Sequence, residues 1–331
     1  MIFLNKNLWK LLYAALVSIV SIVAISRFSG YKNIIEVFKL EKKLALMAFL
    51  IYISITIIDA LRLKITLRFF KYHLSFFHSL KNIIVSVFFS ILTPFSIGGQ
   101  PVQVYHLSNL GVKAHDATSI VISRTIVVMF STIIISFSFL YSVLKILPYD
   151  IHSVVLTGIL ISSVITTLMG IAFFNVGYAD KLLKLLIFFL PKRKKEKIIN
   201  KFNKSVLAYK TSMNTIWSKE KKIIIIDFIM YGIIAFLQPL SLYIPLKYLC
   251  HIDYNYFAVV GLFTILNTVA FYFPTPGSSG GIEGIYFLVL SRIINCSDVA
   301  KSILLWRLSS YYFPLLVGFV FSWNLKGKTT T

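Results

Sequence analysis

Long apolar runs alternate with short polar and basic segments along the whole chain. Six runs reach or approach the roughly 20 residues that a helix needs to cross about 30 Å of hydrocarbon. They occupy residues 8–26, 44–61, 118–144, 153–176, 223–244 and 301–323. The pattern predicts an all-α polytopic integral membrane protein with about six full spans.

Two further apolar stretches are interrupted by Pro and Gly. Residues 82–93 stop at Pro94, and a Gly-rich turn and a short polar helix follow. Later in the chain, another pair of short apolar arms flanks a second turn rich in Pro and Gly. Such broken backbone is tolerated in a bilayer only where it is buried in protein or lines a wet cavity. We therefore predict two re-entrant hairpins, at residues 82–111 and 257–294.

The amino-acid composition supports a membrane protein and limits the classes of molecule that it is expected to bind. The chain has 34 Lys and Arg against 12 Asp and Glu, a net charge of +22, yet only 14% of its residues are charged. Soluble chains have about a quarter of their residues charged, so the soluble-enzyme, collagen-like, disulfide-scaffold and disordered classes are excluded. The basic residues concentrate in residues 192–222, with 11 Lys and Arg against two Glu. Anionic lipid headgroups are the expected partner of this segment, and nucleic acid is not, because no nucleic-acid motif accompanies the charge.

Loop charge orients the spans. The basic segment reads as a cytoplasmic loop, 191–222, which separates a first half, 1–190, from a second half, 223–331, within one transmembrane domain, 1–331. We expect both termini to be cytoplasmic and the protein to lie in the plasma (inner) membrane. The first hairpin would enter from the cytoplasm and the second from outside, so the halves are predicted to be related by inverted symmetry.

The two turns share the pattern T-P-x-S-x-G-G, at residues 93–99 and 275–281. An Arg inside an apolar span, Arg124 or Arg307, follows the last Gly after 25 or 26 residues. Pro breaks helices, Gly permits close backbone approach, and a capped half-helix favours an anion at its N-terminus. Interrupted helices in inverted repeats mark transporter binding sites. Both turns and both arginines are therefore predicted to line one phosphate-binding cavity, unless the glycines serve only tight packing.

The candidate lipid-binding residues lie in the two turns, in the polar helix after the first turn and at the two arginines. They are Thr93, Pro94, Gly98, Gly99, Gln100, Gln103, Tyr105, Arg124, Pro276, Gly280, Gly281, Glu283 and Arg307. A buried cation needs a partner. Arg124 can either snorkel to the interface or meet a lipid phosphate at the cytoplasmic face. Glu283 is the expected partner of Arg307, in a salt bridge that would lock the second hairpin.

The remaining polar groups show no pattern of catalysis or metal binding. The chain has no GxSxG, HExxH or Walker motif, and we expect no catalytic residues, no metal and no cofactor. Cys250 and Cys296 form no CxxC and no zinc spacing, so we expect two inert thiols. Asp59 beside Arg62, and Asp227, are expected to form structural ion pairs.

The motifs TPFSIGGQPVQVYHLSNLGV and FPTPGSSGGIEG, each followed by its Arg, resemble the flippase-like transmembrane region of the lysylphosphatidylglycerol synthase family. In two-part members this region is similar to a lipid-translocating module joined to a cytosolic domain that transfers lysine from charged tRNA to phosphatidylglycerol. This chain resembles the membrane half alone. Many relatives carry an acidic residue and an Arg directly after the first turn, where Gln100 and Gln103 stand here.

The favoured interpretation is a lipid flippase-like protein that binds and translocates a phosphate-bearing headgroup of a membrane phospholipid or a polyprenyl-phosphate lipid. Two alternatives stay open. The first is a family-level transferase role in lipid modification and cationic peptide resistance, acting directly or with a separate synthase or glycosyltransferase. The second is a non-transporting regulatory membrane partner. The sequence leaves the lipid, the energy source and the oligomeric state undetermined.

Overall fold

In the computed structural model, every regular element of the described chain is a helix. The described residues are 41–93, 96, 98–174, 213–214, 216–217, 221–270, 275 and 277–322. The main helices are α3 (Lys42–Phe69), α4 (Phe76–Ile91), α5 (Gly99–Asn109), α6 (Ala114–Ile146), α7 (Tyr149–Phe174), α10 (Lys221–Leu237), α11 (Leu240–Cys250), α12 (Tyr256–Ala270), α13 (Gly281–Ile293), α14 (Val299–Arg307), the π-helix η2 (Leu308–Tyr312) and α15 (Phe313–Ser322). The predicted all-α class is confirmed.

Five helical stretches are long and apolar enough to cross a membrane. They are Lys42–Phe69, Ala114–Ile146, Tyr149–Leu168, Lys221–Cys250 and Val299–Ser322. They coincide with five of the six predicted spans, whereas the span at 8–26 and residues 191–212 of the basic loop lie outside the described residues. Leu160, Val164 and Leu168 of α7 are 61%, 57% and 60% exposed. Extended apolar faces of this kind are solvated by lipid tails, and the chain is an integral membrane protein.

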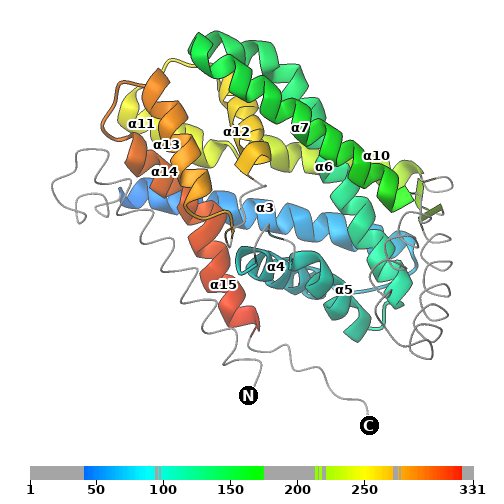
Figure 1. The fold of residues 1–331 in the computed structure, drawn as a ribbon. Helices are drawn as coiled ribbons and strands as arrows, with labels where there is room; N and C mark the ends of the chain where they lie inside the picture. The colour runs from blue at the N-terminus through cyan, green and yellow to red at the C-terminus, as the bar shows by residue number, and fades with distance from the viewer. Residues whose placement is uncertain are drawn as a thin grey trace, which may run out of the picture.

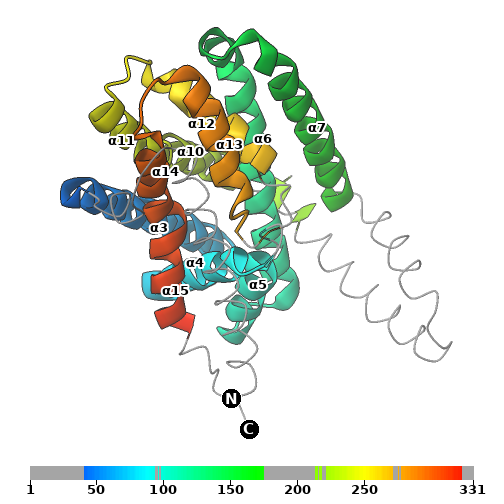
Figure 2. The same cartoon turned by 60° about the vertical axis from the view of Figure 1, so that its left-hand side comes forward.

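Four shorter helices form the two hairpins. α4 and α5 contain 16 and 11 residues, and α12 and α13 contain 15 and 13. At 1.5 Å per residue the longest reaches roughly 24 Å, less than the hydrocarbon thickness. α4 and α5 lie below α3 in both views, whereas α12 and α13 lie above it (Figure 1, Figure 2). The second turn lies close to the end of α4 in the first hairpin. A Cβ added to Gly277 of that turn would be only 3.3 Å from the carbonyl oxygen of Ile91, the last residue of α4.

The helices that follow the two hairpins make corresponding contacts. α6, which follows the first hairpin, packs against α5 of its own hairpin and α12 of the other. The stretch α14–η2–α15, which follows the second hairpin, packs against α13 of its own hairpin and, through α15, against α4 of the first. Apolar side chains make these contacts, including Val143 against the α12 cluster and Phe88 against Leu315 and Phe319. The two halves therefore interlock through equivalent contacts.

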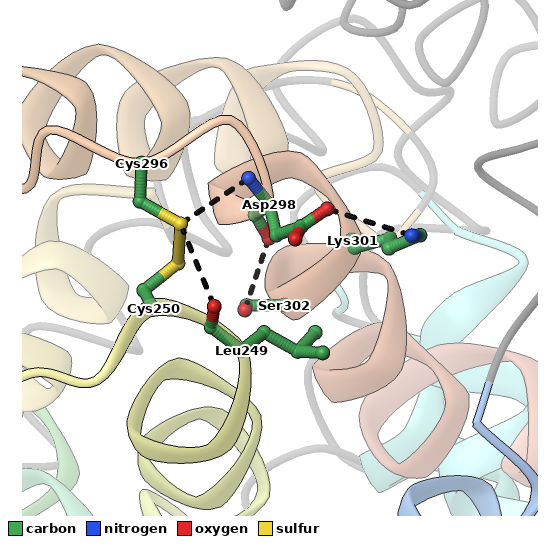
Figure 3. Close-up of a disulfide and its surroundings, with 6 residues drawn as sticks. All are labelled: Leu249, Cys250, Cys296, Asp298, Lys301 and Ser302. Atoms are coloured by element: carbon green, nitrogen blue, oxygen red, sulfur yellow. Dashed lines mark hydrogen bonds and ion pairs between the residues drawn. A yellow bond between two sulfur atoms is a disulfide. The ribbon is translucent and has the colours of Figure 1, made fainter.

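Cys250 and Cys296 form a disulfide, with Cα atoms 5.6 Å apart, so the prediction of inert thiols is wrong. Cys250 ends α11, and Cys296 lies between α13 and α14 (Figure 3). The Asp298 backbone N–H donates to the Cys296 sulfur at 3.3 Å. The sequence separation of 46 residues encloses α12, the second turn and α13. The crosslink therefore closes a loop around the whole second hairpin.

Candidate functional site

A hydroxyl group holds the first turn. Thr93 Oγ1 accepts a hydrogen bond from the Gly98 backbone N–H at 2.8 Å. α5 then begins at Gly99, which lies so close to α4 that a Cβ there would be 2.7 Å from the Ser86 carbonyl oxygen. Gly99 therefore permits close packing of α5 against α4. This agrees with the alternative that the glycines of the repeat serve tight packing.

A buried ion pair holds the second turn. Glu283 Oε2 accepts a hydrogen bond from the Gly280 N–H at 2.8 Å, and Glu283 Oε1 lies 2.7 Å from Arg307 Nε. The Arg307 and Glu283 side chains are only 5% and 4% exposed. Arg307 Nη2 also donates to Ser279 Oγ at 3.3 Å. Gly280 has a φ of 84°, a left-handed conformation that favours glycine, and Gly281 begins α13. The expected pairing of Glu283 with Arg307 is confirmed.

Arg124 belongs to a different cluster from Arg307. Arg124 Nη2 and Arg62 Nη1 both lie 2.7 Å from Asp59 Oδ1. Arg62 also donates through Nε and Nη2 to the two carboxylate oxygens of Asp227, at 3.0 and 2.8 Å. Two cations and two anions thus form a formally neutral group inside the protein, as buried charges require. The expectation of structural ion pairs at Asp59, Arg62 and Asp227 is confirmed.

A cavity of about 260 Å³ lies where the hairpins meet. Its polar wall includes Ser96 of the first turn, Ser278 of the second, Tyr231 of α10, Gln238 between α10 and α11, Asn267 of α12, and Arg307. Arg124 is not among the lining residues, because carboxylates on α3 and α10 hold it elsewhere. The prediction that both arginines line one cavity is therefore wrong for Arg124. Pro94 and Pro276 of the two turns lie outside the described residues.

Besides Arg307 Nε, which lies 2.7 Å from Glu283 Oε1 in the ion pair, two polar groups of residues in the cavity wall lack hydrogen-bond partners among the described residues. They are the indole Nε1 of Trp306 and the Oγ of Ser310. The whole Trp306 residue is only 1% exposed. Leaving a buried donor unpaired costs about 1–3 kcal/mol, so such groups are rare in native interiors. Ser310 lies in η2, which begins directly after Arg307 and is the kind of π-segment that often accompanies functional sites.

The polar residues predicted on α5 lie outside the cavity wall. Gln103 is buried, and its backbone carbonyl accepts a hydrogen bond from Asn82 Nδ2 at 3.0 Å. The same nitrogen lies 3.0 Å from Nδ1 of His106. Gln100 is half-buried, and Tyr105 is 60% exposed. The structure brings none of Gln100, Gln103 and Tyr105 into the cavity wall.

Sequence reasoning missed several residues of the cavity wall, among them Tyr231, Gln238, Asn267 and Trp306. Gln238 and Asn267 carried a usable signal, because a polar side chain within an apolar span usually faces the protein interior or a wet cavity. Gln238 also precedes Pro239, where α10 ends and α11 begins. Tyr231 and Trp306 carried no such signal, because aromatic residues are common throughout these spans.

In this helical membrane protein, two broken hairpins lie on opposite sides of α3, and their turns both contribute to one polar cavity (Figure 1, Figure 2). The chain belongs to the family described as "Lysylphosphatidylglycerol synthase TM region", whose model matches residues 10–318. It is also similar to a protein of Archaeoglobus fulgidus described as "UPF0104 membrane protein". The two are 27% identical over 283 residues, which cover 83% of this chain and 84% of the relative. The resemblance seen in the turn motifs is confirmed.

Proposed function

We propose that this protein is a lipid flippase-like protein that holds a phosphate-bearing headgroup in the cavity while the lipid passes between leaflets. One observation carries the proposal: both turns of the inverted repeat contribute to a single cavity whose wall includes Arg307. In transporters of this architecture, rocking of one half against the other exposes such a central site to each side in turn. A headgroup bound between the hairpin tips would be exposed in the same way.

The donors around the cavity suit a phosphate group. Arg307 places Nε 2.7 Å from Glu283 Oε1, donates through Nη2 to Ser279 Oγ, and lines the cavity. A guanidinium group binds phosphate oxygens through a fixed fork of N–H donors. Trp306 and Ser310 supply two further polar groups that lack partners in the described structure. Together these groups would replace water that the headgroup loses on leaving the interface.

The size of the cavity favours a headgroup over a whole lipid. Its volume of about 260 Å³ lies just below the ~300–1,000 Å³ of sites that enclose drug-sized ligands. Two acyl chains, or a polyprenyl chain, would therefore stay outside, in contact with bilayer and with the apolar outer faces of the spans. Both phospholipids and polyprenyl-phosphate lipids satisfy this requirement.

The disulfide supports an orientation in which the α11–α12 end of the molecule is outside the cell. Disulfides persist in oxidising, extracytoplasmic compartments. Asp150, at the start of α7, pairs with Arg292 near the end of α13, with 3.1 Å between Oδ2 and Nη1. The opposite end carries Arg68, Lys71 and Lys113. This arrangement follows the positive-inside rule and agrees with a plasma-membrane protein whose termini are cytoplasmic.

The transport proposal is tested by reconstitution. Purified protein in proteoliposomes should accelerate the movement of fluorescent phospholipids between leaflets, measured by quenching from outside with dithionite. Folded Arg307→Lys should lower the rate by about tenfold or more, because Lys acts as a point charge and loses the fork. Lys222→Ala, at an exposed position of α10, is the matched control and should stay near the wild-type rate. Absence of movement in wild type, or a wild-type rate in Arg307→Lys, would overturn the proposal.

Orientation is tested separately by cysteine labelling in intact cells. A membrane-impermeant maleimide should label Asp150→Cys from outside. It should label Lys222→Cys only after the cells are permeabilised, because α7, which carries Asp150 in its first turn, and α10, which carries Lys222 in its first turn, begin at opposite ends in the proposed orientation. Equal accessibility of the two positions from outside would contradict the proposed orientation.

A further inference from the structure

We propose that the cavity selects a polyol-phosphate headgroup, meaning a phosphate that carries an uncharged, hydroxyl-rich group, and rejects a headgroup that carries an ammonium. This inference rests on the proposed lipid-handling function and specifies its substrate class. Two features of the cavity wall support it: the wall offers hydroxyl and amide groups, and the carboxylate of Glu283 nearby is already paired with Arg307.

An ammonium group would find no counter-charge in the wall. None of the described residues that line the cavity carries a carboxylate. The closest acidic side chain along the second hairpin, Glu283, already has Arg307 at one oxygen and the Gly280 N–H at the other. An ammonium offers three donors and no acceptor, and its transfer into a dry site is costly without an anion. A cationic headgroup would therefore enter at a large disadvantage.

The aromatic rings of the wall do not offer a replacement for a carboxylate. Arg62 already lies over the Tyr231 ring, with Cζ 5.1 Å from the centroid, and Arg307 lies 5.7 Å from the Trp306 ring. A third ring, Phe263, packs edge-on against Trp306 at 5.6 Å between centroids. At Tyr231 and Trp306 a ligand ammonium would have to share the ring with a protein cation, and like charges repel. The cation–π route is therefore also unfavourable.

Hydroxyl groups, in contrast, match the wall. The Gln238 amide makes no side-chain hydrogen bond to the described residues, and Asn267 Nδ2 donates to the Phe263 carbonyl and the Tyr286 hydroxyl while its Oδ1 remains an acceptor. Ser96 and Ser278 add two hydroxyls from the two turns. A ligand hydroxyl both donates and accepts, so it can pair with amides and hydroxyls alike. A site built to bind hydroxyls strongly disfavours analogues that lack them.

The inference is tested with three fluorescent lipids in the proteoliposome assay: phosphatidylglycerol, phosphatidylinositol and lysyl-phosphatidylglycerol. We expect the first two to move at least about tenfold faster than the lysyl lipid, in which a lysine with two ammonium groups is esterified to one hydroxyl of the glycerol phosphate. Gln238→Glu places a carboxylate in the wall with almost no change in shape, and should raise the rate of the lysyl lipid relative to phosphatidylglycerol by about tenfold. Asn255→Asp, the same change at an exposed position before α12, should leave that ratio unchanged.

Competition in the wild-type protein provides a second test that requires no variant. Excess unlabelled phosphatidylinositol should slow the labelled phosphatidylglycerol, whereas excess lysyl lipid should not. Equal movement of, or equal inhibition by, the lysyl lipid would overturn the headgroup preference and leave the flippase proposal intact. If no lipid moves, the function itself is wrong. Uptake of radiolabelled glycerol phosphate without lipid movement would assign the polyol-phosphate chemistry to a soluble solute and overturn the lipid-based inference.

Discussion

The two hairpins carry the same T-P-x-S-x-G-G turn, but different interactions support them. In the first, the Thr93 hydroxyl holds the Gly98 N–H, and the Arg that follows is bound to carboxylates on other helices. In the second, Glu283 holds both the turn and Arg307, and a disulfide encloses both arms. The repeated motif therefore specifies the backbone shape of a turn without specifying its electrostatic support.

Because of this asymmetry, the two halves contribute different chemical groups to the cavity wall. The second half provides the guanidinium group of the cavity, and a buried ion pair fixes its position. The first half provides Ser96, on a turn held by neutral hydrogen bonds alone in the part that the structure describes. Local stability depends on such buried contacts and crosslinks. We therefore expect the second hairpin to be the more rigid partner, and the following predictions test that difference.

The largest effect is expected from Glu283→Ala. Removing the carboxylate leaves Arg307 buried and unpaired, and breaking a buried pair in this way costs about 3–5 kcal/mol of unfolding free energy. Chemical unfolding in detergent micelles measures the loss. The matched control is Asp150→Ala, which breaks a pair whose side chains are 64% and 62% exposed and should cost no more than about 1 kcal/mol. Equal losses in the two variants would show that the buried pair does not dominate the stability of the second hairpin.

Loss of the disulfide should have the next largest effect. The double variant Cys250→Ser, Cys296→Ser should lose about 2–4 kcal/mol, because the unfolded chain gains freedom when the enclosed loop opens. Hydrogen exchange adds a regional readout: amides of α12 and α13 should exchange faster, and those of α4 and α5 should stay unchanged. Acceleration in the first hairpin of the same size would contradict the assignment of the crosslink to the second.

The architecture was predictable from sequence because the bilayer fixes it. Span length follows from hydrocarbon thickness, and short arms around Pro and Gly identify the hairpins. The Glu283–Arg307 pair was predictable for a related reason, since a buried cation needs an anion and Glu283 directly follows the second turn. In both cases a strong physical cost leaves few alternatives, and the relevant residues lie close to a recognisable motif.

The features that sequence reasoning missed depend on contacts between distant segments. Arg124 is bound by Asp59, which is 65 residues away on α3. Cys250 and Cys296 are adjacent only because α11 and α14 pack together. The cavity wall adds Gln238, from the turn between α10 and α11, and Asn267 of α12. No local spacing encodes these pairings, so the sequence prediction placed the polar residues of α5, which are close to the motif, in a cavity that other residues line.

The smallest effect is expected from Thr93→Val, which keeps the shape of the side chain but removes the acceptor of the Gly98 N–H. The net value of one such hydrogen bond is about 1 kcal/mol, and Thr93 is only partly buried, so the free energy of unfolding should fall by about that amount. Thr118→Val, at an exposed site on α6 with a comparable hydroxyl bond to Ala114, serves as the control and should change stability less. The Gly98 amide should exchange faster in Thr93→Val while amides at Gly280 and Gly281 keep their protection. A loss as large as that of Glu283→Ala would mean that one hydroxyl supports the first turn as strongly as an ion pair supports the second, and the asymmetry between the hairpins would then be wrong.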